Sequence, residues 1–389
     1  MLIGTACSES ETLVERTSMV FDTVRVDMNT AKSVTIDEGI DSLFIIALES
    51  SPEAIFGTIE KLIVSDSLIF IKDNRYSKAI FVFDMTGHFQ FKISNVGAGP
   101  GEYEDIFDFD VSGEDIYVND SGRKILQYSK IDGRFKTEYQ FDSWAGWDIA
   151  ITSDTPTRIL FNRMFGRDGR IEKELGRCLI FSTSTQNDRY ECLYDYHPIF
   201  EEESYRPSIV FARNDEEVFF SPAYTYQLYK YSNQRAKPFI YLDFGEDGFD
   251  NEQLTSIYKS NPSAFGFFQE NPIIHHILQW AITDNLMCMT YSISNLSYSI
   301  FIDLNSKTVY KEGQSVMSRL VYGFTIPLPV ASNGDWLVGY EEVGNLLRSR
   351  DRDTDEKRNK VLKENNIGAL NPNDNPLLIF YKYDTGKLH

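Results

Sequence analysis

The chain repeats one unit six times: a strand with alternating apolar side chains, a short polar turn and a second strand. The copies lie at residues 61–73, 108–120, 149–163, 208–222, 279–292 and 325–340. Each copy places Val, Ile, Phe or Tyr at strand periodicity around Ser, Asp, Asn or Gly, which is the pattern of a β-hairpin. A repeat of this kind predicts an all-β array of similar small sheets.

A second hairpin follows five of the six copies, at residues 79–93, 125–141, 178–196, 226–244 and 298–313. Two hairpins in series make a four-stranded antiparallel sheet. Each sheet must bury both of its faces, and closing six sheets into a ring achieves this without a long exposed edge. We therefore expect a six-bladed β-propeller of four-stranded antiparallel blades.

The sixth copy has no room for its outer strand, because only residues 384–389 follow the strand-like segment at 377–383. We expect residues 32–36 and the alternating segment around Phe44 to supply the outer strand of the last blade. That closure would tie the two chain ends together. The domain organisation that follows is a tail and linker at 1–30 and a single propeller at 31–389.

Long connections interrupt the repeat near residues 164–177, 197–207, 245–278 and 341–376. If the strands of each blade are lettered A to D outward from the channel axis, all four are B–C or D–A connections, which share one face. Insertions gathered on one face of a repeat protein usually mark its working surface. We expect a short helix at 251–258 and a charged helix or loop within 343–365.

Aromatic and basic side chains gather in the connections of that face. We take as candidate ligand-binding residues Tyr103, Trp144, Trp147, Arg163, Tyr205, Arg206 and Tyr224. Aromatic rings with charged neighbours suit carbohydrate or peptide ligands, because the ring stacks on the ligand while polar groups orient it. The alternative is that these side chains pack the loops onto the blades.

A glycine-rich loop joins the first two blades and contains Gly97, Gly99, Pro100, Gly101 and Glu102. Glycine permits positive φ and proline fixes its own φ, so the simpler interpretation is a tight connection. The alternative is a loop that presents backbone N–H groups to an anion. It matches neither a phosphate loop nor a dinucleotide fingerprint, because a strand follows it.

Composition limits the partners and the chemistry. There are 58 acidic residues against 38 basic ones, a formal charge of -20. Nucleic-acid binding needs clustered Lys and Arg, so we exclude nucleic acid as a partner. None of the five histidines lies on an expected inner strand, and no catalytic triad or zinc spacing is present. We expect no cofactor; the alternative is a calcium ion held by Glu102, Asp105, Asp108 and Asp110.

The cysteines indicate where in the cell the protein resides. Cys7 follows small residues and precedes the polar stretch at 8–11, which looks like the end of a bacterial lipoprotein signal. This predicts lipid attachment at Cys7 and membrane contact through that anchor alone, the alternative being an ordinary cysteine in a frayed terminus. Cys178 and Cys192 flank a hairpin, where either a disulfide or two separate thiols would fit. We expect Cys288 to be a small buried hydrophobe.

Residues 81–93, the GAGPGEY motif at 97–103 and the FDFD motif at 107–110 resemble the NHL-like six-bladed propeller lipoproteins of Gram-negative gut anaerobes. Residues 375–382 resemble the closing strand of that family, and the resemblance covers nearly the whole chain. It implies an exported, lipid-anchored propeller at the outer membrane, on the cell surface or in the periplasm. It implies no reaction, since a fold alone does not give a function.

Together these features favour a monomeric binding or protein-interaction module for a glycan, a peptide or an envelope protein. The alternative function is a hydrolase or lyase that cleaves glycans or peptides on the same face. An enzyme of that kind would bring two carboxylates or a metal together at the channel mouth. A binding module would present an aromatic platform instead.

Overall fold

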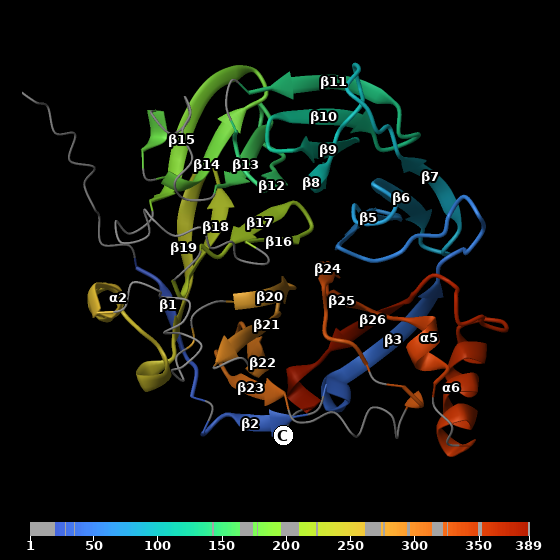
Figure 1. The fold of residues 1–389 in the computed structure, drawn as a ribbon. Coiled ribbons are helices and arrows are strands. Elements are labelled where there is room, and N and C mark those ends of the chain that lie inside the picture. The colour runs from blue at the N-terminus through green and yellow to red at the C-terminus, as the bar shows by residue number, and fades with distance from the viewer. Residues whose placement is uncertain are drawn as a thin grey trace, which may run out of the picture.

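The computed structural model describes residues 20–27, 29–34, 36–141, 144–163, 174–176, 178–195, 210–222, 225–260, 274, 277–293, 296–312, 322–324, 326–348 and 352–387. Within these residues the chain forms six sheets arranged as blades around a central channel (Figure 1). The predicted six-bladed β-propeller is confirmed.

The strands of each blade follow one another in chain order from the channel outward, except in blade 6, whose outer strand is β3. Blade 1 contains β4 (Lys61–Ser65), β5 (Leu68–Asp73), β6 (Ala79–Asp84) and β7 (Phe89–Ile93), blade 2 contains β8 (Ile106–Ser112), β9 (Asp115–Asp120), β10 (Lys124–Ser129) and β11 (Phe135–Gln140), and blade 3 contains β12 (Asp148–Ile151), β13 (Arg158–Asn162), β14 (Cys178–Ser184) and β15 (Asn187–Asp195). Blade 4 contains β16 (Phe211–Asn214), β17 (Glu217–Phe220), β18 (Gln227–Ser232) and β19 (Arg235–Asp243), blade 5 contains β20 (Ile277–Ile282), β21 (Leu286–Ile293), β22 (Leu296–Asp303) and β23 (Val309–Glu312), and blade 6 contains β24 (Ala331–Asn333), β25 (Trp336–Glu341), β26 (Leu377–Tyr383) and β3 (Ile40–Ala47).

The A–B turns explain how the repeated sequence gives a repeated structure. In blades 1, 2, 4 and 6 the first of two turn residues has a positive φ: Asp66 (53°), Gly113 (56°), Asp215 (48°) and Gly334 (55°). Glycine adopts this left-handed conformation without steric cost, and aspartate tolerates it better than most residues. The polar residues that separate the strands of the repeat therefore fix the turns.

Side chains of one strand alternate between the two neighbouring blades, as β6 shows. Phe81 and Phe83 pack in a cluster shared with blade 6, whereas Ile80 and Val82 pack in a cluster shared with blade 2. Because both faces of the strand are covered, its sequence is an almost continuous apolar run. The core is a ring of such clusters between blades.

Of the three N-terminal strands, β3 closes the ring as predicted, whereas β1 and β2 lie on other blades. β3 pairs antiparallel with β26 and sets Phe44 opposite Phe380, as expected for the outer strand of the last blade. The placement of residues 32–36 in that blade is wrong. β2 (Lys32–Val34) pairs in parallel with β23 of blade 5, and β1 (Asp22–Arg25) pairs in parallel with β19 of blade 4 (Figure 1). Since β3 fills the outer position of blade 6, the chain before it runs along the edges of the preceding blades.

Helices occur in the connections. α2 (Asn251–Ser260) lies between blades 4 and 5, where the sequence predicted a short helix, and α5 (Val343–Leu346) and α6 (Arg352–Glu364) lie between β25 and β26. Single 3₁₀ turns form η1 (Ile36–Gly39), η3 (Gly245–Asp247) and η4 (Thr385–Lys387). No helix in the described part of the chain is long and apolar enough to cross a membrane.

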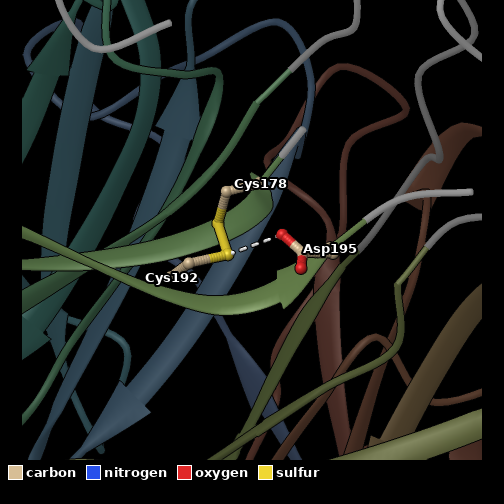
Figure 2. Close-up of side chains that lie close together, drawn as sticks. All are labelled: Cys178, Cys192 and Asp195. Atoms are coloured by element: carbon tan, nitrogen blue, oxygen red, sulfur yellow. Dashed lines mark hydrogen bonds between the residues drawn. A yellow bond between two sulfur atoms is a disulfide. The ribbon is translucent and has the colours of Figure 1, made fainter. Parts of the chain in front are cut away.

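A disulfide joins Cys178 of β14 to Cys192 of β15, with the two Cα atoms 5.6 Å apart (Figure 2). Of the two states that the sequence left open, the structure therefore has the bridge. Asp195 lies beside it, with Oδ1 3.2 Å from the Cys192 sulfur. This trio is not a metal site, because bridged sulfurs are not thiolate ligands. Cys288 is buried and takes no part in a disulfide, as expected.

Candidate functional site

The inner strands of all six blades line a cavity of about 830 Å³ in the channel. Each inner strand follows a D–A connection and ends at an A–B turn. Its first residues therefore lie at the end of the channel that carries the long connections, which we call the insertion end. Its last residues lie at the opposite end, which we call the short-turn end.

Two lysines of blade 1 meet blade 2 at the insertion end. Lys61 and Lys72 are direct partners across the β4–β5 hairpin. The Lys61 Nζ lies 2.9 Å from both carboxylate oxygens of Asp108. The Lys72 Nζ donates a hydrogen bond of 2.8 Å to the carbonyl oxygen of Phe107. Both ammonium groups are therefore directed at the first residues of β8.

A β-bulge presents Phe107 at this point. The β8–β9 ladder skips from Ile106 to Asp108 and leaves Phe107 without a partner strand residue. Such bulges re-aim a side chain and recur beside functional sites. The Phe107 ring stacks on the Trp147 indole, with centroids 4.1 Å apart and planes inclined by 20°. Both rings are half-buried and line the cavity.

Asp108 also links this group to blade 3. Its Oδ2 accepts the backbone N–H of Ile149 at 2.9 Å, and the neighbouring Asp148 lines the cavity.

The Lys72 side chain is only 9% exposed, and burial lowers the pKa of its ammonium group, while the nearby Asp108 and Glu60 carboxylates oppose that change. We define the channel corner as Lys61, Lys72, Phe107, Asp108, Trp147 and Asp148.

The short-turn end holds a second charged group, centred on Arg213 of β16. Its guanidinium pairs with the Asp110 carboxylate of blade 2 and donates to the Ile151 carbonyl of blade 3. Asp110 also accepts the Ile151 N–H at 2.6 Å. The Ser332 hydroxyl of blade 6 donates to the Arg213 carbonyl at 2.8 Å. This network links blades 2, 3, 4 and 6 and fixes the short-turn end of the channel.

A family described as "Domain of unknown function (DUF4934)" matches residues 20–382. The chain belongs to this family. No curated protein matches the chain. A candidate exported protein of Bacteroides fragilis has a similar structure, with 17% identity and a TM-score of 0.71 over 93% of this chain and 99% of its own. This similarity shows a shared propeller fold.

Two further solved structures are more distant. The WD40 repeats of RRP9 match 90% of this chain and 99% of their own, with 12% identity and a TM-score of 0.40. BamB from Moraxella catarrhalis matches 69% of this chain and 66% of its own, with 10% identity and a TM-score of 0.37. β-Propellers commonly serve as protein-interaction scaffolds, and membership of the DUF4934 family indicates no particular activity.

Of the candidate residues in this DUF4934 propeller, Trp147 lies at the channel corner. Trp144 packs edge-on against it, with ring centroids 5.8 Å apart, and covers Gly122, where an added Cβ would come within 2.3 Å of the indole nitrogen. Trp144 therefore packs against both Trp147 and the backbone at Gly122. Tyr205, Arg206, Tyr224 and the lipidation candidate Cys7 lie outside the described residues.

Tyr103 and Arg163 are buried. Tyr103 is 0% exposed, its hydroxyl donates to the carbonyl oxygens of Lys78 and Ile93 at 2.6 and 3.0 Å, and burial raises the pKa of its phenol. Arg163 is 5% exposed and donates to the Cys178 carbonyl at 3.0 Å. Both placements correspond to the packing alternative, so we leave these residues out of the candidate site.

The glycine-rich loop closes on itself. Gly101 has a φ of 74°, and a Cβ there would come within 2.6 Å of the Phe135 ring. The Gly99 N–H donates to the Glu102 carboxylate at 2.8 Å, and the Gly97 N–H donates to the Tyr103 carbonyl at 2.9 Å. These bonds around Pro100 form the tight connection that the sequence favours, and the loop's own carboxylate already occupies the Gly99 donor.

The carboxylates considered for calcium each have a different partner. Glu102 accepts from Gly99, Asp105 lies 3.5 Å from the Lys78 ammonium, and Asp108 and Asp110 pair with Lys61 and Arg213. Among the residues that the structure describes, these four do not gather into a metal-binding group.

The two lysines, Phe107 and Arg213 were not among the residues predicted from the sequence. A hairpin with its turn at 66–67 pairs residue 61 with residue 72, so the lysine pair was open to prediction from the register. Arg213 is a basic residue within an inner strand, and this alone is weaker evidence that it belongs to a site. The bulge that exposes Phe107 has no comparable signature in this sequence.

Proposed function

We propose that this propeller is an exported, lipid-anchored binding module that holds a glycan, a peptide or a segment of an envelope protein at the channel corner. The observation that carries the proposal is the half-buried Phe107–Trp147 pair, set by a bulge into a cavity beside Lys61 and Asp108. Flat aromatic faces bind sugar rings and peptide groups, and fixed charges orient them.

Three features support export and anchoring. The Cys178–Cys192 disulfide is typical of oxidising compartments. The similar Bacteroides fragilis protein is a candidate exported protein. Cys7 follows small residues in the manner of a lipoprotein signal, as in the NHL-like lipoproteins that the sequence resembles. Labelling of expressing cells with a fatty-acid analogue should mark the wild type and leave Cys7→Ala unmarked.

The corner favours binding over cleavage. Glycoside cleavage uses two carboxylates with separate proton-transfer roles. At the corner, Asp108 is held in an ion pair with Lys61 and accepts the Ile149 N–H, and Asp148 accepts the Asn162 amide at 2.9 Å. These contacts suit fixed electrostatic groups better than groups that exchange protons during turnover.

A panel of immobilised glycans and peptides tests the proposal. We expect Trp147→Leu to weaken binding of the captured ligand by about tenfold or more, because central aromatic residues dominate binding energy. Trp336→Leu is the matched control: this tryptophan packs on Phe44 in blade 6, away from the cavity lining. Unchanged affinity in Trp147→Leu would rule out the corner, and cleaved panel members detected by mass spectrometry would favour the enzymatic alternative.

A further inference from the structure

A further aromatic side chain lies at the insertion end, in the B–C connection between β5 and β6 of blade 1. Tyr76 is 65% exposed, more than any other aromatic residue whose burial the structure describes. Large rings of this kind are usually buried, and those that stay exposed recur in binding surfaces. This ring is therefore a candidate contact for a ligand.

The Tyr76 ring is held in place although it is exposed. The carboxylate of Asp73, a residue with no exposed surface, accepts the Tyr76 N–H at 3.0 Å and the Gly57 N–H at 2.8 Å. The ring lies against Gly57, where an added Cβ would come within 2.4 Å of it. A fixed ring loses little conformational entropy when a ligand binds to it.

The same connection borders the channel corner. Asn74 lines the cavity, and its Oδ1 accepts the N–H of Ile106 at 3.1 Å. Ile106 directly precedes Phe107 of the corner. The chain from Asn74 to Tyr76 spans at most about 7 Å. One ligand can therefore contact both Tyr76 and the corner.

The surroundings of Tyr76 repeat the chemistry of the corner. The guanidinium carbon of Arg75 lies 5.5 Å from the centre of the Tyr76 ring, and the Arg75 N–H donates to the Glu60 carboxylate at 2.7 Å. We define the blade 1 rim as Glu60, Arg75 and Tyr76. The corner likewise combines aromatic rings with a cation and a carboxylate, Lys61 and Asp108. Two adjoining sites with the same parts suit a ligand made of repeating units.

Opposite charges balance at this end of the channel. The carboxylates that line it are Glu60, Asp105, Asp108 and Asp148, and the cations beside them are Lys61, Lys72, Arg75 and Lys78. With neither sign in excess, neither an anionic nor a cationic ligand gains a net attraction. A hydroxyl group can both donate and accept a hydrogen bond, so it can contact the cations and the carboxylates alike.

We propose that a neutral oligosaccharide binds across the channel corner and the blade 1 rim, with one sugar ring against the Phe107–Trp147 pair and another on Tyr76. This inference rests on the proposed function, since it names the ligand class of that site and adds a second subsite. The apolar face of each sugar stacks on an aromatic ring, and its hydroxyl groups contact the charged neighbours. A glycan presents the same unit to both subsites, whereas a peptide presents a different side chain to each.

Chain length tests whether two subsites act together. The probes are neutral oligomers of glucose, xylose, mannose and N-acetylglucosamine, from disaccharides to hexasaccharides, and calorimetry measures their binding. In the series that binds, we expect the hexasaccharide to bind about tenfold more tightly than the disaccharide, because the second contact is made within an already bound ligand. Added salt should leave the affinity unchanged, since the ligand has no charge to screen.

Variants of Tyr76 locate the second subsite. We expect Tyr76→Ala to weaken hexasaccharide binding about tenfold and to leave unchanged the binding of the disaccharide, which fills the corner alone. Tyr76→Phe keeps the ring and should bind as the wild type does. Ile131→Ala is the control, because Ile131 is 78% exposed on a C–D turn at the short-turn end. Thermal melting confirms that each variant folds.

The outcomes separate this inference from the proposed function. Affinity that does not depend on chain length, or unchanged hexasaccharide binding in Tyr76→Ala, would overturn the second subsite. Binding of peptides alone, sensitive to Trp147→Leu, would overturn the glycan and leave the proposed function intact. Absence of any binding that depends on Trp147 would count against both.

Discussion

The two ends of the channel use the same chemistry for different purposes. At each end an aspartate of β8 pairs with a cation from another blade: Asp108 with Lys61 at the insertion end, and Asp110 with Arg213 at the short-turn end. Asp108 and Asp110 lie two residues apart on one strand. Their surroundings differ. Asp108 directly follows Phe107, whose half-buried ring stacks on Trp147, whereas Arg213 bonds to blades 2 and 3 and its carbonyl oxygen accepts from blade 6.

The difference shows how a propeller separates stability from recognition. Short turns with fixed φ values hold the short-turn end, and the Arg213 network joins non-adjacent blades there. The insertion end has long connections and a bulged strand, which sets the Phe107 ring against Trp147 in the cavity wall. A binding surface needs a rigid support, and the opposite end of the same strands supplies it.

The largest effect should come from Arg213→Met. The Asp110 carboxylate, in a residue only 3% exposed, would then keep one backbone N–H and lose its charged partner. Breaking a buried pair in this way costs about 3–5 kcal/mol. Denaturant titration of wild type and variant measures this loss. Adding Asp110→Asn should restore much of it, and a loss below about 1 kcal/mol would mean that the network does not fix the short-turn end.

Removing the disulfide should cost somewhat less. Cys178 and Cys192 are 14 residues apart, and a cross-link that closes a loop of this size stabilises by about 3 kcal/mol. The double variant Cys178→Ser, Cys192→Ser should therefore unfold at lower denaturant concentration than the wild type. A reducing agent should bring the wild type to the same midpoint and leave the variant unaffected. Identical midpoints for oxidised wild type and variant would show that the bridge does not support the insertion end.

Lys61→Met should have a smaller effect than Arg213→Met. Asp108 keeps the Ile149 N–H, and Lys72 remains nearby. The Lys61 side chain is 28% exposed, so solvent screens the pair, and we expect a loss of about 1–2 kcal/mol. The same denaturant titration measures it. A loss equal to that of Arg213→Met would make the two ends of the channel energetically equivalent and remove the contrast between them.

The smallest effect is a pH dependence from Lys72. Burial lowers the pKa of this ammonium group, so the unfolded chain holds the proton more tightly than the folded one. The charge therefore costs stability below the folded pKa, and the cost disappears as the pH rises toward the unfolded value of about 10.4. The stability of the wild type relative to Lys72→Met should rise between about pH 7 and pH 10. A constant difference across that range would contradict this assignment.

The features predicted correctly from the sequence, the hairpins and the number of blades, are those that depend on local residue patterns. Apolar alternation and turn residues such as Asp66 and Gly113 define the hairpins, and six hairpins, five of them followed by a second, predict a ring of six blades. The parallel edge pairing of β2 escaped prediction, because a three-residue strand on a blade edge has no pattern of its own. Trp147 was among the aromatic residues that the sequence placed in the connections between strands.

Longer-range features of the site escaped prediction for a related reason. Arg213 and Asp110 are 103 residues apart, so their pairing depends on how the blades are placed around the ring. Phe107 reaches Trp147 only because β8 bulges at that residue. Local sequence does not encode either feature.

A crystal structure of the protein with the tightest ligand from the panel is the most direct test of the channel corner as the binding site. We predict ligand density at the insertion end, in contact with the Trp147 and Phe107 rings and near Asp148. Density on the short-turn face beyond Arg213, or on the outer edges of the blades, would contradict that assignment.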